Sequence, residues 1–264
     1  MNNVIFCIIL YNTKVSESKS ITSIINNWNE SCSNSKIIIF NNGDDIVEVN
    51  EIKEIKEINE NIEIFQILIN GSLSKIYNKC IQLNKGYNFV FLDDDTEVSK
   101  DYFNEVLNCS SDILLPRVVC NNLDVYPVFT KEGVQSITSG LYISSKLVSL
   151  LTNFESKVFD ERFDLYGIDT AFFYKINKNK INYDISSHSL IHDLSHLTSG
   201  SNVFREKEVF LANSASLIPY FNFYLLKQVI GTLFKFIYRL DYRTIFSAFI
   251  SFCSCRVIRI IKTI

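Results

Sequence analysis

The chain has 264 residues, of which 47% are hydrophobic and 13% aromatic, and its formal net charge is −3. This is a globular composition rather than a disordered one, and its length favours one large domain with an appendage over two equal domains. The seven cysteines follow neither a disulfide framework nor metal-ligand spacing, so we expect buried thiols in a reducing compartment. No basic region or small-residue cleavage site marks a signal peptide at the N-terminus.

The net charge is unevenly distributed along the chain. Residues 203–264 hold nine Lys/Arg against three Asp/Glu, a formal charge of +6, which leaves −9 for residues 1–202. We therefore expect two parts: one large domain over 1–202 and a basic helical tail over 203–264. The tail is the part suited to an anionic surface.

Strands and helices alternate through the first third of the sequence. Residues 4–10, 36–40 and 62–69 are apolar and β-branched, as in buried strands, and residues 18–28, 46–59 and 73–86 carry apolar residues at helical spacing. Ser18 or Ser20 is expected to cap the first helix, and Gly86 to stop the third. This alternation predicts βαβ units and a parallel sheet.

The next strand, residues 89–92, ends in three consecutive acids, Asp93, Asp94 and Asp95. Ligands of open α/β sheets bind at the carboxyl ends of the strands. Side chains alternate along an extended chain, so Asp93 and Asp95 are expected to point the same way and Asp94 elsewhere. Two convergent carboxylates suit Mg²⁺ or Mn²⁺ completed by substrate phosphates. The alternative is a solvated acidic turn that leads into a helix at Ser99.

After Asp95 the strict alternation ends. Strands are predicted over 113–119, 124–130 and 137–144, the last with Gly140 inside it, and a helix over 145–152. A further helix opens at Tyr166-Gly167-Ile168-Asp169 and runs to about residue 178.

Residues 3–200 resemble the family-2 glycosyltransferases, in particular the rhamnosyltransferase-like members that build bacterial surface polysaccharides such as O-antigen or capsule. The resemblance is carried by the order and spacing of several short motifs: Tyr11-Asn12, the Asn-Asn-Gly turn at 41–43, Asn70-Gly71 with Asn78, Phe-Leu-Asp-Asp-Asp-Thr at 91–96, Ser139-Gly140-Leu141, Phe159-Asp160-Glu161 and Tyr-Gly-Ile-Asp-Thr at 166–170. It implies that residues 1–202 form a nucleotide-sugar-binding glycosyltransferase domain of the GT-A fold. That fold is a mixed, mainly parallel, Rossmann-like α/β sheet flanked by helices, here with a C-terminal helical appendage.

The resemblance also implies roles for individual residues. A divalent cation, Mg²⁺ or Mn²⁺, would be held by Asp95 and Asp93, with His192 near it and the diphosphate. The general base of an inverting transfer would be Asp169, which a helix N-terminus would keep ionised; the alternative is an ordinary helix N-cap. The donor, a nucleotide-diphosphate sugar, would contact residues Tyr11, Asn12, Asn41, Asn70, Asn78, Asp93, Asp94 and Gly140. The acceptor would be a saccharide or a lipid-linked molecule, and no nucleic-acid partner is expected.

Three histidines, His188, His192 and His196, follow one another at four-residue intervals. On a helix they would share a face and suggest zinc, yet residues 186–191 have poor helix propensity. A hydrogen-bonded loop histidine is the plain alternative for His192.

The sequence departs from the family pattern where acids are common, at Asn41, Ile168 and Ala171. Three classes therefore stay open: an inverting glycosyltransferase, another metal-dependent nucleotide enzyme, and a catalytically silent relative that acts as a membrane-associated scaffold. The absence of a Gly-rich phosphate loop with a Lys counts against the second class.

The tail carries Lys227, Lys235, Arg239 and Arg243 at intervals of four or eight, as on one face of a helix, among many aromatics. This pattern is typical of a helix in a membrane interface, and the alternative is a helical cap or a dimer contact. Its longest uncharged stretch, 244–255, is shorter than the ~20 residues of a spanning helix. We expect a cytoplasmic protein, peripheral at the inner face of the cell membrane.

Overall fold

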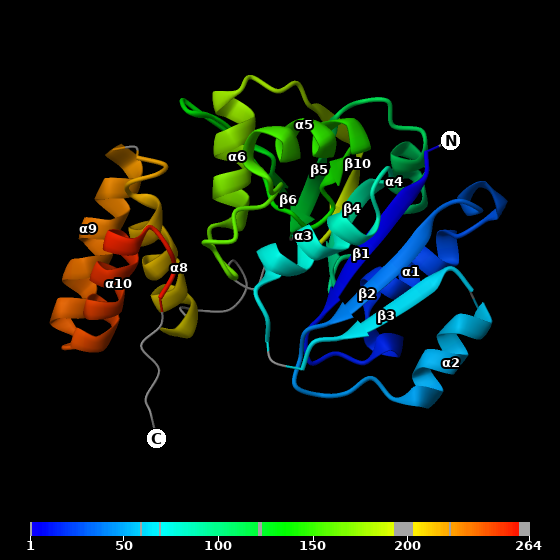
Figure 1. Ribbon diagram of the computed structural model, residues 1–264, viewed down its shortest axis with the longest axis horizontal. Helices are drawn as coiled ribbons and strands as arrows, with labels where there is room; N and C mark the ends of the chain where they lie inside the picture. Colours follow the sequence, from blue (N-terminus) through cyan, green and yellow to red (C-terminus); the bar gives the residue numbers. More distant parts are fainter. Residues whose placement is uncertain are drawn as a thin grey trace.

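A mixed, mainly parallel sheet forms the centre of the computed structural model, which describes residues 2–58, 60–68, 70–120, 123–192, 203–221 and 223–258 (Figure 1). The order of its strands is β10-β5-β9-β4-β1-β2-β3, with β6 paired to β5. Among the described strands of this sheet, β9 and β6 run antiparallel to their neighbours and the others pair in parallel. The strands are β1 (Val4–Leu10), β2 (Lys36–Asn41), β3 (Ile62–Gln66), β4 (Asn88–Asp93), β5 (Ile113–Cys120), β6 (Leu123–Tyr126), β9 (Tyr142–Ile143) and β10 (Asp184–Ile191); β7 (Val128–Thr130) and β8 (Gly133–Gln135) form a separate hairpin.

Helices cover both faces of the sheet, and each face has its own apolar cluster. One face packs against α1 (Lys19–Asn27), α4 (Lys100–Leu107) and, at its edge, α2 (Val49–Ile58). The other packs against α3 (Leu73–Leu83), α5 (Ser145–Glu155) and α6 (Ile168–Lys178). Two 3₁₀ turns, Val15–Glu17 and Glu30–Cys32, flank α1, and Ser18 caps that helix by accepting from the Ile21 amide.

The central strands are buried on both faces, as their apolar sequences predict. Their registers bring the strand ends together, since Ile9 of β1 lies opposite Asp93 of β4 and Leu10 lies opposite Asn41 of β2. The residues that follow β1, β2 and β4 therefore meet at one edge of the sheet.

Two predicted strands differ from the structure. Residues 137–144 were expected to be one strand, but only Tyr142–Ile143 is extended, because Gly140 has a φ of 87° and the Leu141 amide donates to the Thr138 carbonyl in a turn. The strand expected over 124–130 is two strands, β6 and β7, with different partners; Pro127 lies between them and has no amide hydrogen to donate to a ladder.

Strand β10 was not predicted. It pairs in parallel with β5 at the edge of the sheet and ends at Ile191, immediately before His192. His188 lies in this strand, so the helical histidine face considered above is wrong for 188–192; His196 lies outside the described residues.

The C-terminal part forms three helices, α8 (Val203–Ser216), α9 (Phe223–Tyr238) and α10 (Tyr242–Ser254) (Figure 1). Pro219 lies between the first two, whereas Gly231 does not interrupt α9. Leu240 has a φ of 56° and follows the end of α9. The basic residues 227, 235, 239 and 243 therefore do not share one helix: two lie in α9, one just after it and one in α10.

The C-terminal helices are joined to the α/β layers. Phe210 and Ala215 of α8 belong to the same apolar cluster as Phe163 and Phe172. The Asp160 carboxylate accepts a hydrogen bond from Tyr220 and pairs with Arg162 at 2.6 Å. None of the described helices combines the length and the hydropathy needed to cross a membrane.

Candidate active site

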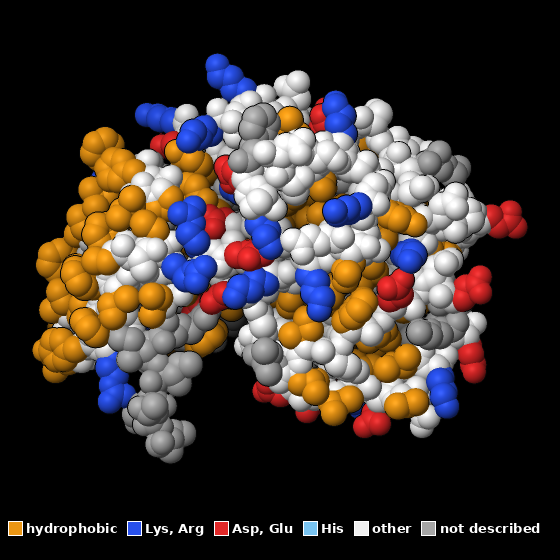
Figure 2. All heavy atoms as spheres, in the orientation of Figure 1, with side chains coloured by type: hydrophobic (Ala, Val, Ile, Leu, Met, Phe, Trp, Pro, Cys, Tyr) orange, Lys and Arg blue, Asp and Glu red, His pale blue; other side chains and the backbone are white. Residues whose placement is uncertain are grey.

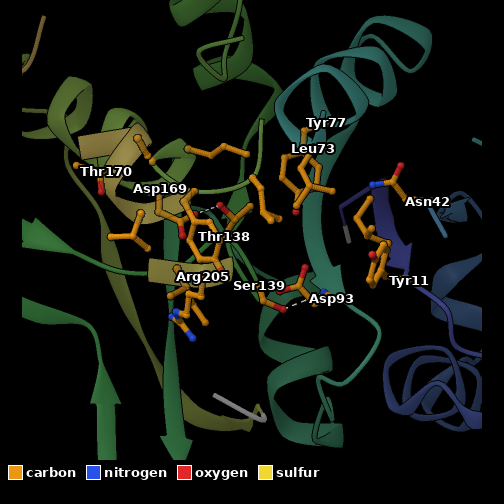
Figure 3. A pocket seen from close by; sticks show the side chains of 18 of the residues that line it. Tyr11, Asn42, Leu73, Tyr77, Asp93, Thr138, Ser139, Asp169, Thr170 and Arg205 are labelled. Atoms are coloured by element: carbon orange, nitrogen blue, oxygen red, sulfur yellow. Dashed lines mark hydrogen bonds between the residues drawn. The ribbon is translucent and has the colours of Figure 1, made fainter. Parts of the chain in front are cut away.

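A cavity of about 610 Å³ opens at the carboxyl edge of the sheet (Figure 3). Its walls come from the ends of β1, β2 and β4, the turn at 137–139, the start of α6 and one side of α8. The volume lies within the range of small-molecule sites.

The predicted metal ligands meet in this cavity. Asp93, Asp95 and His192 each offer a ligand atom, and these atoms all lie within 4.8 Å of one another. The Nδ1 atom of His192 is 3.0 Å from Oδ1 of Asp95, and its Nε2 atom is 3.9 Å from Oδ2 of Asp93. Within the part of the chain that the structure describes, this is the one such group of three or more His, Cys, Asp or Glu.

A hydrogen-bonded chain positions this cluster. The Thr96 hydroxyl is 2.8 Å from Nδ1 of His192 and 2.6 Å from the Ser139 hydroxyl, which accepts from the Asp93 amide. Oδ1 of Asp95 is buried and has no hydrogen-bond partner of acceptable geometry among the described residues, although His192 is near. An orphaned carboxylate oxygen beside a second carboxylate and an imidazole fits a divalent cation.

Burial and charge repulsion perturb the acids of this cluster. Burial raises the pKa of Asp93 to about 7; His192 opposes this shift, and the charges of Asp95, Asp169 and Asp94 add to it. A cation would relieve this repulsion, because it compensates several carboxylates at once.

Asp94 turns away from the cluster, as the alternation of side chains predicts. Its Oδ2 atom accepts a hydrogen bond of 3.0 Å from the Tyr11 amide, at the end of β1. Asp94 therefore fixes the position of Tyr11 in the cavity wall.

Asp169 lies in the first turn of α6 and lines the same cavity. It is not the N-cap, which is Gly167 with a φ of 89°. Its Oδ1 atom accepts a hydrogen bond from the Thr138 hydroxyl (Figure 3). Burial raises the pKa of Asp169, and the hydrogen bonds from Thr138 and the charge of His192 oppose this shift.

Two of the predicted donor-binding residues outside the Asp triplet, Tyr11 and Asn70, line the cavity. They lie on adjacent loops, with the Asn70 side-chain amide 3.4 Å from the Tyr11 hydroxyl. Both are accessible to a ligand that enters along the ends of β1 and β2.

The structure does not bring four other candidates, Asn12, Asn41, Asn78 and Gly140, into the cavity wall. The Asn12 side chain accepts from the Asp44 amide, the Asn41 amide donates to Gln66 and to the Asp45 carbonyl, and the Asn78 amide bonds both backbone polar groups of Phe159. Gly140 has no room for a side chain, since a Cβ there would lie 2.2 Å from Leu190. These four residues hold the loops around the cavity.

Several lining residues were not predicted, among them Asn42, Tyr77, Tyr126, Thr138, Ser139, Tyr166 and Arg205. Asn42 is adjacent to a predicted residue, and its side chain ties the end of β2 to both backbone polar groups of Gly71. The position of Asn42 in the Asn-Asn-Gly turn could have predicted that it lies at the cavity. Arg205 comes from α8, and no local pattern connects that helix to the site.

Neither protein-family models nor curated proteins match the sequence. Solved structures do match the fold. Residues 1–349 of TarS from S. aureus in complex with UDP-GlcNAc have a TM-score of 0.56 at 13% identity, over 96% of this chain and 89% of that one. The mannosyltransferase PcManGT from Pyrobaculum calidifontis in complex with GDP-Man and Mn²⁺ has a TM-score of 0.57 at 9% identity, over 89% and 75%. The predicted GT-A fold is confirmed.

Proposed function

We propose that the chain is a metal-dependent, inverting glycosyltransferase that uses a nucleotide-diphosphate sugar. One observation carries the proposal: the Asp93, Asp95 and His192 cluster and the half-buried carboxylate of Asp169 line one cavity at the carboxyl edge of the sheet. The similar fold of two sugar-nucleotide-bound proteins supports it.

The residues of the cavity would have different roles in the transfer reaction. A divalent cation held by Asp93, Asp95 and His192 would offset the charge of the departing diphosphate. Asp169 would accept the proton of the acceptor hydroxyl as that oxygen attacks the anomeric carbon, and Thr138 orients its carboxylate. Because burial raises the pKa of Asp169, the group is a stronger base than a solvated carboxylate once it is ionised.

The experiment compares nucleotide binding and sugar transfer with and without Mn²⁺. By calorimetry with UDP, GDP and dTDP, we expect at least one nucleotide to bind the wild type about tenfold or more tightly with Mn²⁺, and Asp95→Ala to lose this gain because it lacks a ligand. Asp101→Ala, an exposed acid of α4, is the matched control.

Two results of this experiment would count against the proposal. Unchanged Mn²⁺ dependence in Asp95→Ala would remove Asp95 from the metal site. A wild type with no metal-dependent binding to any nucleotide would favour the catalytically silent relative considered above.

The finer identity of the substrates is also proposed. The resemblance to rhamnosyltransferase-like enzymes makes rhamnose the first donor sugar to test, and surface-polysaccharide synthesis, of O-antigen or capsule, the first context. A panel of nucleotide sugars with lipid-linked saccharides, read by product mass, would identify donor and acceptor.

We further propose that the C-terminal part, from about residue 203, holds the enzyme at the inner face of the membrane. Figure 2 shows hydrophobic side chains gathered over the C-terminal helices. The outer helical face consists of eight aromatic residues that are each more than half exposed: Phe221, Phe223, Tyr224, Phe234, Tyr238, Tyr242, Phe246 and Phe249. Exposed aromatics with basic neighbours are typical of membrane-interface helices.

The charges of this region only partly support membrane contact. Lys235 and Arg239 both pair with Glu206, and neither is free to meet an anionic lipid on its own. Lys227 and Arg243 are exposed and form no ion pair with any residue that the structure describes. The exposed aromatic side chains of the outer helical face therefore support membrane contact more strongly than the basic residues do.

A further inference from the structure

Helix α8 forms one wall of the cavity. Five of its residues line it: Phe204, Arg205, Val209, Ala212 and Asn213. Arg205, Val209, Ala212 and Asn213 follow one another at i, i+4, i+7 and i+8, which places them along one side of the helix. The C-terminal part therefore contributes directly to the site.

Arg205 is the one Lys or Arg among the described residues that line the cavity, whereas Asp93, Asp94, Asp95 and Asp169 contribute four acids. Its guanidinium lies 5.5 Å from the centre of the Tyr166 ring. It forms no ion pair within 4.0 Å with a described residue, in contrast to the neighbouring Lys207, which pairs with Asp241 at 2.6 Å. A guanidinium on an aromatic face keeps its N–H donors available for an anion.

The contact of Arg205 with the Tyr166 ring places it near the start of α6. Burial and the charge of Asp169 raise the pKa of Tyr126, and Arg205 lowers it, so that ring lies near both charges. Arg205 also stacks on Tyr166, three residues before Asp169. Arg205 therefore lies beside the segment that leads into α6, the helix that carries Asp169 in its first turn.

We propose that Arg205 binds an anionic group, a phosphate or a carboxylate, on the acceptor, close to the hydroxyl that Asp169 deprotonates. This rests on the proposed function, and it names the class of acceptor. In the proposed function a cation at the metal cluster would compensate the donor diphosphate, which leaves Arg205 available for a second anion. The rings of Tyr126 and Tyr166 beside it suit the face of a sugar or polyol that carries the anion.

The experiment uses the full chain and small acceptor mimics. Glucose, glucose 6-phosphate and glucuronate are titrated into wild type, Arg205→Gln and Arg205→Lys and followed by ligand-observed NMR. We expect one anionic mimic to bind the wild type about tenfold or more tightly than glucose, Arg205→Gln to abolish this preference and Arg205→Lys to keep part of it. The better of the two anions distinguishes a phosphate from a carboxylate. Lys100→Gln, an exposed cation of α4, is the control and should keep the full preference.

A second measurement separates this inference from the proposed function. Affinity for UDP or GDP with Mn²⁺ should change less than about twofold in Arg205→Gln. A tenfold loss of nucleotide affinity would assign Arg205 to the donor diphosphate and overturn the inference, as would equal binding of the anions by wild type and Arg205→Gln. A wild type that binds the anions through Arg205 but binds no nucleotide with Mn²⁺ would overturn the proposed function and leave the anion site standing.

Discussion

The three consecutive acids at 93–95 have different environments although they are adjacent in sequence. Asp93 and Asp95 face His192, while Asp94 accepts from the Tyr11 amide. Strand alternation separates the middle acid from the other two, and the long-range hydrogen bonds of Thr96 and Ser139 then fix the geometry. The local sequence specifies the ligands, and a residue almost a hundred positions later completes the set.

The raised pKa of Asp93 predicts that protons and Mn²⁺ compete for the cluster. Its pKa of about 7 means that the carboxyl is ionised above pH 7 and gains a proton as the pH falls. Metal ions bind the ionised form, so Mn²⁺ affinity should fall from pH 8 to pH 6, by up to about tenfold per unit below pH 7 for this group. Calorimetry with Mn²⁺ at the two pH values measures it.

The control for this prediction is Asp93→Asn, which has no proton to exchange in this range. It should bind Mn²⁺ more weakly than the wild type at pH 8 and lose the part of the pH dependence that Asp93 supplies. Equal affinity of the wild type at pH 6 and pH 8 would show that no carboxyl of the cluster titrates in this range.

Asp169 is predicted to act on the rate and not on donor binding. Asp169→Asn keeps the shape and can still accept from Thr138, but it cannot take a proton. General-base catalysis contributes ~10²–10⁴-fold, so kcat should fall by about that factor while the affinity for the donor nucleotide changes little. Thr138→Val, which removes only the orienting hydroxyl, should cost less. Equal transfer rates in Asp169→Asn and wild type would exclude it as the base.

At the scale of elements, the sequence predicted the sheet best where its strands are buried on both faces. The strands β1, β2 and β4 are uninterrupted apolar runs, and α1, α3 and α4 repeat apolar residues at helical spacing. Strand β10 was missed because it lies at an edge and buries only two of its eight residues, so it carries no hydrophobic pattern.

The sequence predicted the acids of the site but not all of its other lining residues. Sequence identifies which residues follow a strand, and all the predicted acids line the cavity. The sequence does not show which side-chain amides hydrogen-bond within the protein instead of facing a ligand. The amides of Asn41 and Asn78 are of this kind, because they bond to Gln66 and to the Phe159 carbonyl. Arg205 could not be predicted as a lining residue, because the packing of α8 on the α/β layers depends on contacts between residues that are distant in sequence.

The turn at Gly140 is predicted to be sensitive to a single methyl group. Gly140→Ala would place a Cβ 2.2 Å from Leu190 and 2.9 Å from Pro116, at a φ of 87° that disfavours any side chain. We expect a loss of about 2 kcal/mol or more in the free energy of unfolding, measured by urea denaturation. This turn carries Thr138 and Ser139, so Mn²⁺ affinity should fall as well.

Gly231→Ala is the matched control for this prediction. Gly231 lies inside α9, where a Cβ would meet nothing within 4 Å. The same change there should stabilise the protein by about 0.5–1 kcal/mol, because alanine favours a helix. Similar effects of the two substitutions would show that the turn at Gly140 is less constrained than the structure indicates.

At the scale of the whole molecule, the C-terminal helices combine the two alternatives that the sequence left open. Helix α8 packs on the α/β layers and lines the cavity, as a cap does, while α9 and α10 leave the outer helical face exposed. Removing residues from 203 onward would therefore open the cavity and expose the core at Phe163 and Phe172. Membrane binding is better tested by substitutions on the outer helical face of the intact chain.

The last prediction concerns that face. The double variant Phe234→Glu with Phe249→Glu replaces two exposed rings, so it should leave the fold intact. If the face enters a bilayer, each lost ring costs about 1.5 kcal/mol or more of apolar burial, and vesicle affinity should fall by ~100-fold or more.

Sedimentation with vesicles rich in phosphatidylglycerol measures this affinity. The control is Phe129→Glu, on an exposed strand of the α/β part. Binding of the wild type should weaken moderately with salt, since much of the local basic charge is already paired. A wild type that ignores such vesicles but sediments as a dimer, and becomes a monomer in the double variant, would assign the face to a second copy of the chain.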